Sequence, residues 1–232
     1  MSTESTRPSG PGGVVARRVG PLAFQHHGTA LGTCRADHPG AFERMRRAAA
    51  AVGLARVVVP RLAFSTGVAD HTASSEVAPG VFRVDAVADG VWLDGPGTGV
   101  AIANGDCTIG LLYSERAAVV LHLGRACVHR RDGQPTVLAR AIERLGGDAG
   151  ALRLWLGGAI GPCCHGYPPG PFVDELRARW GRAAVGGRVR WGPRKGQVAC
   201  DHQAVVAAHA LNLGVGHLQV ARGCTACAGL SD

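Results

Sequence analysis

Lysine is almost absent from this 232-residue chain, aromatic residues make up 5% of it, and its apolar runs are short. Lys195 is the single lysine among 25 basic residues, so arginine carries nearly all of the net charge of +8. The longest apolar stretches, such as Val100–Ala103 and Ala117–Leu121, fall far short of the roughly 20 residues that span a bilayer. We therefore expect no membrane-spanning segment. Because the arginines are scattered and few aromatic side chains could stack on bases, we do not expect nucleic-acid binding.

Features of a secreted protein are also missing. The opening residues, MSTESTRPSGPGG, are polar and lack the apolar run that follows the basic start of a signal peptide. Eight cysteines would suggest disulfides in a small secreted chain, but at this length, and with 46% hydrophobic residues, we expect reduced thiols. The sequence therefore predicts a soluble cytoplasmic protein, a monomer or small homo-oligomer. Its domains would be a flexible N-terminal arm over residues 1–20 and a single domain over residues 21–232.

Short apolar runs typical of strands fill the middle of the chain. The predicted strands are Arg56–Pro60, Val81–Ala88, Gly90–Leu93, Thr98–Ala103, Cys107–Tyr113, Ala117–Leu123, Leu152–Ile160 and His217–Ala221. The predicted helices are Ala41–Gly53, Thr136–Leu145, Pro171–Trp180 and Asp201–Leu213. Because the strands follow one another and the helices mostly lie outside these runs, the sequence predicts an α+β fold. We expect a mixed or antiparallel, sandwich-like β-sheet core with helices packed outside it.

Two of these runs predict an antiparallel hairpin that turns at Tyr113–Arg116. A loop of two residues, or of four residues with Leu112 opposite Ala117, places Cys107 directly opposite His122. Directly opposed side chains share a face, with Cβ atoms about 4.5–5.5 Å apart. A loop of three or five residues would instead put the thiol and the imidazole on opposite faces.

The paired thiol and imidazole have two chemical interpretations. They are close enough to bind one zinc ion, at about 2.3 Å from sulfur and about 2.0–2.1 Å from nitrogen. They are equally close enough to form a Cys–His nucleophile pair. The remaining alternative is a buried apolar thiol beside a core histidine. Gly105-Asp106 and Gly124 put both residues at strand ends, where a cavity can open, and this favours the chemical interpretations.

Four segments, in this order, resemble the laccase-domain family (polyphenol-oxidase-type, YfiH-like). The family is marked by an Ala-Asp-Cys strand, a His-Ala-Gly-Trp-Arg-Gly segment, an Ile-Gly-Pro turn and a late Cys-Thr-x-Cys. The matching segments are Asp106-Cys107, His122-Leu123-Gly124, Ala159-Ile160-Gly161-Pro162-Cys163-Cys164 and Cys224-Thr225-Ala226-Cys227. The resemblance covers most of the chain from about Phe42 onwards, and implies that the domain is a laccase-domain-like catalytic domain.

The resemblance also implies a metal site. Such proteins have a Gln-x-His segment upstream of the cysteine, and its histidine completes a His–Cys–His zinc site. The matching histidine here would be His71, so the implied zinc ligands and catalytic residues are His71, Cys107 and His122. A fourth coordination position left open for water or substrate is typical of a catalytic zinc site. Zinc would lower the pKa of its bound water towards about 7.

The activity that the resemblance implies concerns purine nucleosides. Family members phosphorolyse the N-glycosidic bond and deaminate adenosine. The chain would thus be a zinc-dependent hydrolase or transferase acting on a purine-nucleoside-like small molecule, with phosphate as a candidate co-substrate. The word laccase is a poor guide, because multicopper oxidases need several His-x-His pairs and this sequence has none.

The chain departs from the family pattern at several positions. After His122 the tryptophan is absent and Arg125 comes one place early, Ala69 stands where the glutamine is expected, and the aromatic–Ser–Arg tail is missing. These departures indicate a divergent member with a changed substrate. Two further hypotheses stay open: an enzyme of specialised biosynthesis that uses the same Cys/His site on another metabolite, and a catalytically silent binding protein.

Three residues are candidates for substrate binding. Arg125 suits an anion, and Cys164 and Tyr167 would lie at the cavity rim beyond the Ile-Gly-Pro turn. Cys224 and Cys227 have the spacing of zinc or redox motifs, but no second Cys-x-x-Cys accompanies them. A structural loop is therefore the favoured interpretation of that pair.

Overall fold

The computed structural model describes the chain except for residues 1–14, 20–21, 27–37, 39, 131–132 and 228–232. Most of the predicted N-terminal arm therefore lies outside the described residues and stays a prediction. Residues Val15–Val19 form strand β1, which pairs antiparallel with β2 (Leu22–His26). No helix among the described residues has the length and apolar character needed to cross a bilayer.

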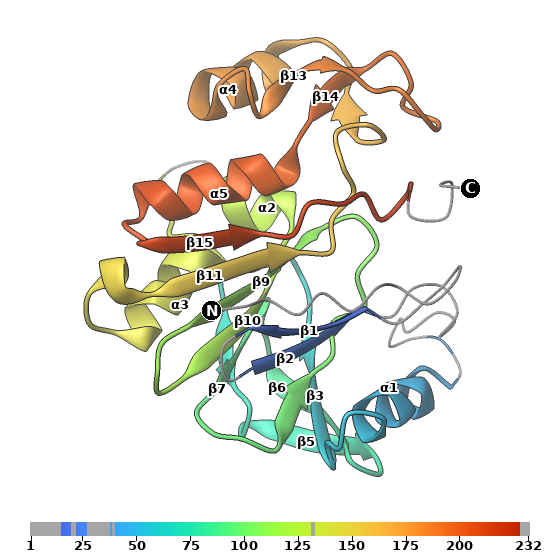
Figure 1. The fold of residues 1–232 in the computed structure, drawn as a ribbon, viewed down its shortest axis with the longest axis vertical. Helices are drawn as coiled ribbons and strands as arrows, with labels where there is room; N and C mark the ends of the chain where they lie inside the picture. The colour runs from blue at the N-terminus through green and yellow to red at the C-terminus, as the bar shows by residue number, and fades with distance from the viewer. Residues whose placement is uncertain (1–14, 20–21, 27–37, 39, 131–132, 228–232) are drawn as a thin grey trace.

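A six-stranded mixed sheet forms the centre of the molecule (Figure 1). Its order is β15-β11-β9-β10-β7-β4, in which β9, β10, β11 and β7 are antiparallel neighbours while β15 and β4 join the edges in parallel. The strands are β4 (Val68–Asp70), β7 (Gly90–Leu93), β9 (Thr108–Tyr113), β10 (Ala118–Leu123), β11 (Arg153–Gly157) and β15 (His217–Val220). Every residue of β9 is buried, because this strand is paired on both sides and covered on both faces.

Two smaller sheets flank the central one. The first has the order β5-β6-β3-β8 and consists of β3 (Arg56–Arg61), β5 (Ser74–Ala78), β6 (Val81–Val87) and β8 (Thr98–Val100). The second has the order β12-β14-β13 and consists of β12 (Gly166–Tyr167), β13 (Val185–Arg188) and β14 (Val198–Cys200). Figure 1 shows this three-stranded sheet, with α4, above α5 and the central sheet.

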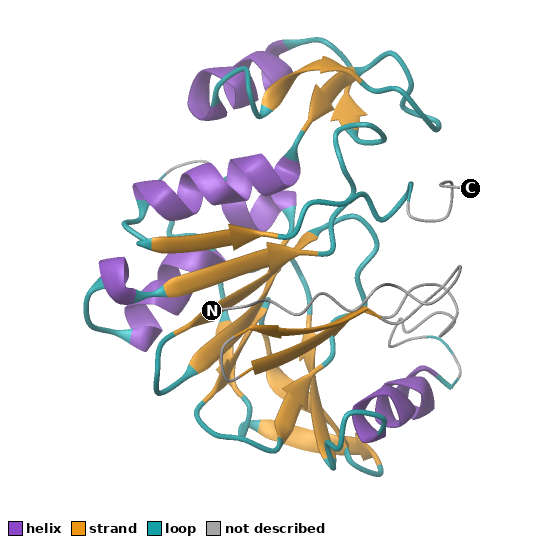
Figure 2. Cartoon of the chain, in the orientation of Figure 1, coloured by secondary structure: helices purple, strands orange, loops and turns teal. Residues whose placement is uncertain are grey.

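Five α-helices of the described residues lie outside the strands (Figure 2). They are α1 (Ala41–Ala50), α2 (Arg125–Val128), α3 (Val137–Leu145), α4 (Pro171–Trp180) and α5 (His202–Asn212), and a short 3-10 helix, Ala149–Ala151, precedes β11. Their starts follow local chemistry: Thr136 and Asp201 cap α3 and α5 by accepting backbone N–H bonds, and a proline opens α4. The largest hydrophobic cluster joins α3, α4 and α5 to strands β9, β10 and β11. The arrangement confirms the α+β prediction.

Candidate active site

The β9–β10 hairpin has a different register from the predicted one. Tyr113 pairs with Ala118 and His122 pairs with Ile109, so the prediction that Cys107 lies directly opposite His122 is wrong by two positions. The reason is the turn: Ser114 N–H donates to the Ala117 carbonyl at 2.9 Å, and the Ser114 hydroxyl accepts from the N–H of Ala117, so the loop spans residues 114–117. Side chains alternate between the two faces of a sheet, so a shift of two positions leaves Cys107 on the same face as His122.

A buried carboxylate holds the imidazole of His122. Asp89, just before β7, is fully buried, and its Oδ1 lies 2.7 Å from His122 Nδ1. A carboxylate can only accept here, so Nδ1 carries the proton and Nε2 is the nitrogen available to another group. The His122 N–H also donates to the Asp89 carbonyl at 2.7 Å. Two hydrogen bonds therefore fix both the position and the orientation of the ring.

The loop after β3 donates the remaining hydrogen bonds that the Asp89 carboxylate accepts. The backbone N–H groups of Ala63, Phe64 and Ser65 donate to the Asp89 oxygens at 3.3, 3.2 and 2.6 Å, and the Ser65 hydroxyl donates at 2.8 Å. Successive amides of this kind form an anion-binding concavity. Asp89 is thereby saturated, so it acts as an orienting partner of His122 and is not available as a metal ligand.

Phe64 occupies the position beside His122 in a strained backbone conformation. Its φ is +54°, in the left-handed region that bulky residues rarely adopt. Its ring centroid lies 5.3 Å from that of His122 at an interplanar angle of 61°. A Cβ on Gly124 would come within 2.7 Å of the Phe64 ring, so the close approach requires glycine there. Phe64 is 50% exposed and presents an aromatic surface at the site.

Two thiols complete the immediate surroundings of His122. Burial alone would lower the pKa of His122, but hydrogen bonds with Asp89, Cys107 and Cys127 raise it to about 11. Burial would likewise raise the pKa of Asp89, and its hydrogen bonds with His122 and Ser65 instead hold it at about 2. At neutral pH the pair is therefore an imidazolium bound to a carboxylate, with the two thiols within hydrogen-bonding reach of the imidazolium.

The backbone of Cys107 is clamped at the start of β9. Its N–H donates to Asn104 Oδ1 at 3.1 Å, and the Asn104 amide donates to the Cys107 carbonyl and to the Gly158 carbonyl, the latter at 2.7 Å. One asparagine thus ties the cysteine loop to the end of β11. The thiol is partly exposed, so a small molecule can reach it.

The structure does not bring His71 to this group. Strand β4 pairs parallel with β7, with Val68 opposite Gly90 and Asp70 opposite Trp92, which carries His71 towards the far end of β7 from Asp89. There its Nδ1 lies 3.6 Å from a carboxylate oxygen of Asp70 and 3.7 Å from one of Asp94. The ring that lies beside His122 from this half of the chain is that of Phe64, in the loop after β3, and not that of His71.

The implied His–Cys–His donor set is therefore not assembled. Among the described residues, two groups of closely spaced metal ligands occur, and neither contains His71 or Cys107. One group is Asp89, His122 and Cys127, and the other is Cys163, Cys164, Cys224 and Cys227. The first group includes the saturated carboxylate of Asp89, and this leaves one imidazole nitrogen and one thiol as donors.

Of the three predicted substrate-binding residues, the structure places Cys164 in the wall of a cavity. Cys164 lines a cavity of about 290 Å³, together with Asp106, Ile160, Trp191, Gly192, Pro193, Arg194 and Ala226. The Tyr167 hydroxyl lies 3.2 Å from His165 Nε2, and Arg194 donates to Nδ1 of the same histidine. Arg125 is exposed, with its guanidinium 5.1 Å from the Phe172 ring centroid. Their roles in binding stay predictions.

Sequence reasoning missed two buried polar residues of the site, Asp89 and His202. His202 Nδ1 lies 3.2 Å from the Thr108 hydroxyl, and its Nε2 is buried without a hydrogen-bond partner. Burial, and to a smaller extent the neighbouring His165 and His122, lowers the pKa of His202 to about 4. The only sequence signal for Asp89 is its position as an acidic residue between two apolar runs. A buried carboxylate of this kind needs hydrogen-bond or charge partners.

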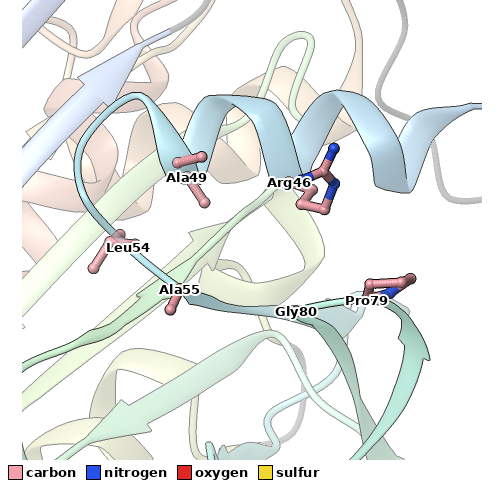
Figure 3. A pocket seen from close by; sticks show the side chains of 7 residues that line it. Arg46, Ala49, Leu54, Ala55, Pro79 and Gly80 are labelled. Carbon is pink, nitrogen blue, oxygen red and sulfur yellow. The ribbon is translucent and has the colours of Figure 1, made fainter.

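A second cavity, of about 280 Å³, lies between α1 and the turn before β6 (Figure 3). Its lining residues are Arg46, Ala49, Ala50, Leu54, Ala55, Pro79 and Gly80. Arg46, its single charged side chain, is already paired with Glu43 at 2.6 Å. The lining offers no nucleophile or acid–base group, so the chemistry belongs to the first cavity.

Comparison with known proteins identifies the family. Residues 12–230 match the family model described as multi-copper polyphenol oxidoreductase laccase. No curated protein matches the sequence. Among solved structures, the chain is similar to Neisseria meningitidis protein NMB0706, a DUF152 protein (22% identity, 95% of this chain and 87% of that chain, TM-score 0.63).

Two further structures share the fold. They are YlmD from Geobacillus stearothermophilus (19% identity, 93% of this chain and 82% of that chain, TM-score 0.63) and Bacillus licheniformis hypothetical protein YfiH (15% identity, 81% and 72%, TM-score 0.57). At these identities the likeness establishes the fold alone. The family model, however, matches almost the whole chain, and the chain therefore belongs to the multi-copper polyphenol oxidoreductase laccase family, also known as the laccase-domain or YfiH-like family.

Proposed function

We propose that this protein is an enzyme that cleaves a C–N bond of a purine-nucleoside-like small molecule, with Cys107 as its nucleophile. The observation that carries the proposal is the 2.7 Å bond between Asp89 and His122, which holds an imidazolium beside a partly exposed thiol. A thiol next to an imidazolium is the arrangement of activated cysteine nucleophiles. In this proposal Asp89 is a positioning residue and Cys107 and His122 are the catalytic residues.

The chemistry follows from these three groups. The Cys107 thiol first loses its proton to solvent, and the thiolate, paired with the His122 imidazolium, attacks the carbon that carries a nitrogen leaving group. His122 gives its proton to the departing nitrogen, and the neutral imidazole then takes a proton from the incoming water. Water then displaces the thiolate, which completes hydrolysis, either as deamination or as cleavage of the N-glycosidic bond. Phosphate in the place of water would complete phosphorolysis. One covalent intermediate thus accounts for both the hydrolase and the transferase alternatives.

The surroundings suit a planar heteroaromatic substrate. Phe64 and Trp191 are 50% and 58% exposed, and aromatic faces of this kind stack on bases. The cavity of about 290 Å³ lies near the lower end of the size range of small-molecule pockets. Arg194 lines it, and Arg125 supplies a further cation for an anionic co-substrate. We place the enzyme in the cytoplasm, which the seven free thiols among the described residues support.

A zinc enzyme is the second candidate, favoured by the donor chemistry around His122. Asp89 holds Nδ1, as carboxylates commonly do for metal-bound histidines, and Nε2 could ligate zinc together with Cys107 and Cys127. When bound there, zinc would activate water or polarise a leaving group. It ranks second because, in the part of the chain that the structure describes, no group of three ligands within 4.8 Å of one another contains both thiols, and because Phe64, not His71, lies beside His122.

Turnover assays with matched variants test the proposal. We expect the purified chain to convert adenosine or inosine, with or without phosphate, to a deaminated or base-free product. Cys107→Ala should lower kcat/KM by roughly a thousandfold, whereas Cys200→Ala, at a buried thiol outside the site, should retain activity. Activity that survives a chelator supports the thiol nucleophile, and activity that needs added zinc supports the second candidate. Turnover of no purine nucleoside, or full activity of Cys107→Ala, would refute the proposal.

A further inference from the structure

Four cysteines from two distant segments meet at one point beside the cavity of the candidate active site. Cys163 and Cys164 follow the Gly161-Pro162 turn after β11, and Cys224 and Cys227 follow β15. All four sulfur atoms lie within 4.8 Å of one another. The Cys227 sulfur is 3.4 Å from that of Cys163 and 3.2 Å from that of Cys164.

These distances suit a metal-bound set of thiolates better than a disulfide. Four sulfurs at about 2.3 Å from a tetrahedral zinc ion stand about 3.8 Å from one another, within the range found here. A disulfide needs an S–S distance of about 2.05 Å. Cys224 and Cys227 supply two of the sulfur ligands, and the adjacent Cys163 and Cys164 supply the other two. The group therefore contains the four ligands of a closed site. Soft thiolate ligands of this number and geometry select zinc over harder divalent cations.

The backbone around the cluster is fixed without help from any metal. The carbonyl of Cys163 accepts the N–H groups of Arg190 and Trp191 at 2.8 and 3.0 Å. Thr225 N–H donates to the Ala159 carbonyl at 3.0 Å, and Cys227 N–H donates to the Cys224 carbonyl at 3.1 Å. Three segments of the chain therefore converge on the four sulfurs and hold them in place.

A glycine leaves the space that the sulfurs need. A Cβ on Gly161 would lie 3.0 Å from the Cys224 Cβ and 3.4 Å from the Cys163 sulfur. Any side chain at this position would press directly on the cluster. The close approach of the two cysteine segments thus depends on the glycine of the Ile-Gly-Pro turn.

We propose that Cys163, Cys164, Cys224 and Cys227 together bind one Zn²⁺ ion as a closed, structural tetrathiolate site. Each thiol releases its proton on binding, and all four coordination positions are filled by protein, so the ion has no open position for substrate. The site is separate from Cys107 and His122. It does not depend on the proposed catalytic function, nor on the zinc alternative at His122.

The position of this site gives it a consequence for the cavity. Cys164 and Ala226 line the hollow beside Asp106 and Arg194. The Thr225 hydroxyl donates to the Gly105 carbonyl at 2.9 Å, and Ile160 N–H donates to the Asp106 carbonyl at 3.0 Å, next to Cys107. Zinc bound by the four cysteines would therefore fasten the C-terminal segment as a wall of the cavity and stabilise the loop that carries Cys107.

Zinc and cobalt binding to the full chain tests the proposal. The informative variant is Cys107→Ser/Cys127→Ser, which removes both thiols beside His122 and leaves the four-cysteine cluster intact. We expect it to retain one equivalent of zinc, and its Co²⁺ form to show the intense thiolate-to-metal absorption of a tetrahedral tetrathiolate. Cys224→Ser/Cys227→Ser should lose this equivalent and this absorption, whereas Cys200→Ser should keep both.

Thiol mapping of the wild-type chain keeps the test decisive if the Cys224→Ser/Cys227→Ser variant does not fold. With zinc bound, we expect these four cysteines to resist alkylation, and we expect them to react after a strong chelator removes the metal. The metal-free protein should also have a lower Tm, which added Zn²⁺ restores. Three results would overturn the proposal. The first is the absence of tight zinc binding in Cys107→Ser/Cys127→Ser, and the second is equal alkylation of the four cysteines with and without zinc. The third is a mass lower by two hydrogens in protein purified under reductant, which marks a Cys163–Cys227 or Cys164–Cys227 disulfide.

Discussion

At position 64, in the loop after β3, a phenylalanine ring lies against the imidazole of His122. Its amide donates to Asp89 while its ring packs over Gly124 and His122. The backbone and the side chain of residue 64 therefore have separate roles. The amide can donate to the Asp89 carboxylate in any variant whose φ at position 64 stays positive. The side chain at this position is then free to set the chemistry of the site.

Replacing this ring by an imidazole should create the missing ligand. We expect Phe64→His to bind Zn²⁺ at least about tenfold more tightly than the wild-type site does, because it adds a nitrogen donor beside His122 and Cys107. Isothermal titration in the Cys224→Ser/Cys227→Ser background isolates this site from the four-cysteine cluster. Phe64→Leu is the matched control, and equal zinc affinity of the two variants would show that position 64 does not face the metal position.

The residues of the site could be predicted from the sequence only in part. Cys107 and His122 stand out because each is a polar residue at the end of an aliphatic strand, and the structure places their side chains within hydrogen-bonding reach of each other. His71 was the nearest upstream histidine, but proximity in sequence does not decide which loop reaches His122. That choice depends on the parallel pairing of β4 with β7, a long-range contact that no local pattern encodes.

Among the elements, helices with clear local signals match their predictions most closely. Helix α4 has the predicted bounds, Pro171–Trp180, and α5, His202–Asn212, lies within one residue of its predicted bounds, Asp201–Leu213. The β9–β10 hairpin was predicted with a shifted register, because the hydrogen bonds of Ser114 draw Ala117 into the turn. Short strands such as β12 and β14 have two and three residues, too few for a periodic pattern, and were not predicted.

The cap of α3 gives a prediction at this scale. The Thr136 hydroxyl accepts the Ala139 N–H at 3.2 Å and lies 2.8 Å from His209 Nε2 in a buried position. Thr136→Ala removes both bonds, so we expect the free energy of unfolding to fall by about 1–2 kcal/mol, measured by urea denaturation. Thr136→Ser keeps the hydroxyl and should retain most of the stability. A loss of equal size in both variants would show that packing of the methyl group, and not the cap, stabilises the helix.

In the whole molecule, the Asp89–His122 pair joins two of the sheets. The loop after β3 belongs to the four-stranded sheet, and His122 to the central sheet, so the carboxylate fastens one to the other. The pKa of Asp89 is held at about 2, below its unfolded value of about 3.9, so the stabilisation is present above pH 4 and is lost as the pH falls towards 2. The pKa of His122 is raised from about 6.5 to about 11, so its stabilisation is complete below about pH 6.5 and is lost progressively as the pH rises towards 11.

Acid unfolding of Asp89→Asn tests this link. We expect the variant to be less stable than the wild type by roughly 2–3 kcal/mol at pH 7, since it loses the charged pair. The difference should shrink between pH 4 and pH 2, where the wild-type carboxylate becomes protonated as well. Urea denaturation at pH 7 and pH 3 measures both values. A difference that stays constant with pH would show that the charge of Asp89 does not contribute to stability.

The most direct measurement is the alkylation rate of Cys107, mapped by mass spectrometry at neutral pH with and without a chelator. If His122, positioned by Asp89, activates this thiol, Cys107 should react first among the described cysteines before the chelator is added, because no metal blocks it. Asp89→Asn should slow the reaction by about tenfold or more, because the imidazolium loses its partner. A Cys107 that resists alkylation until the chelator is added, or that reacts equally fast in Asp89→Asn, would contradict the account.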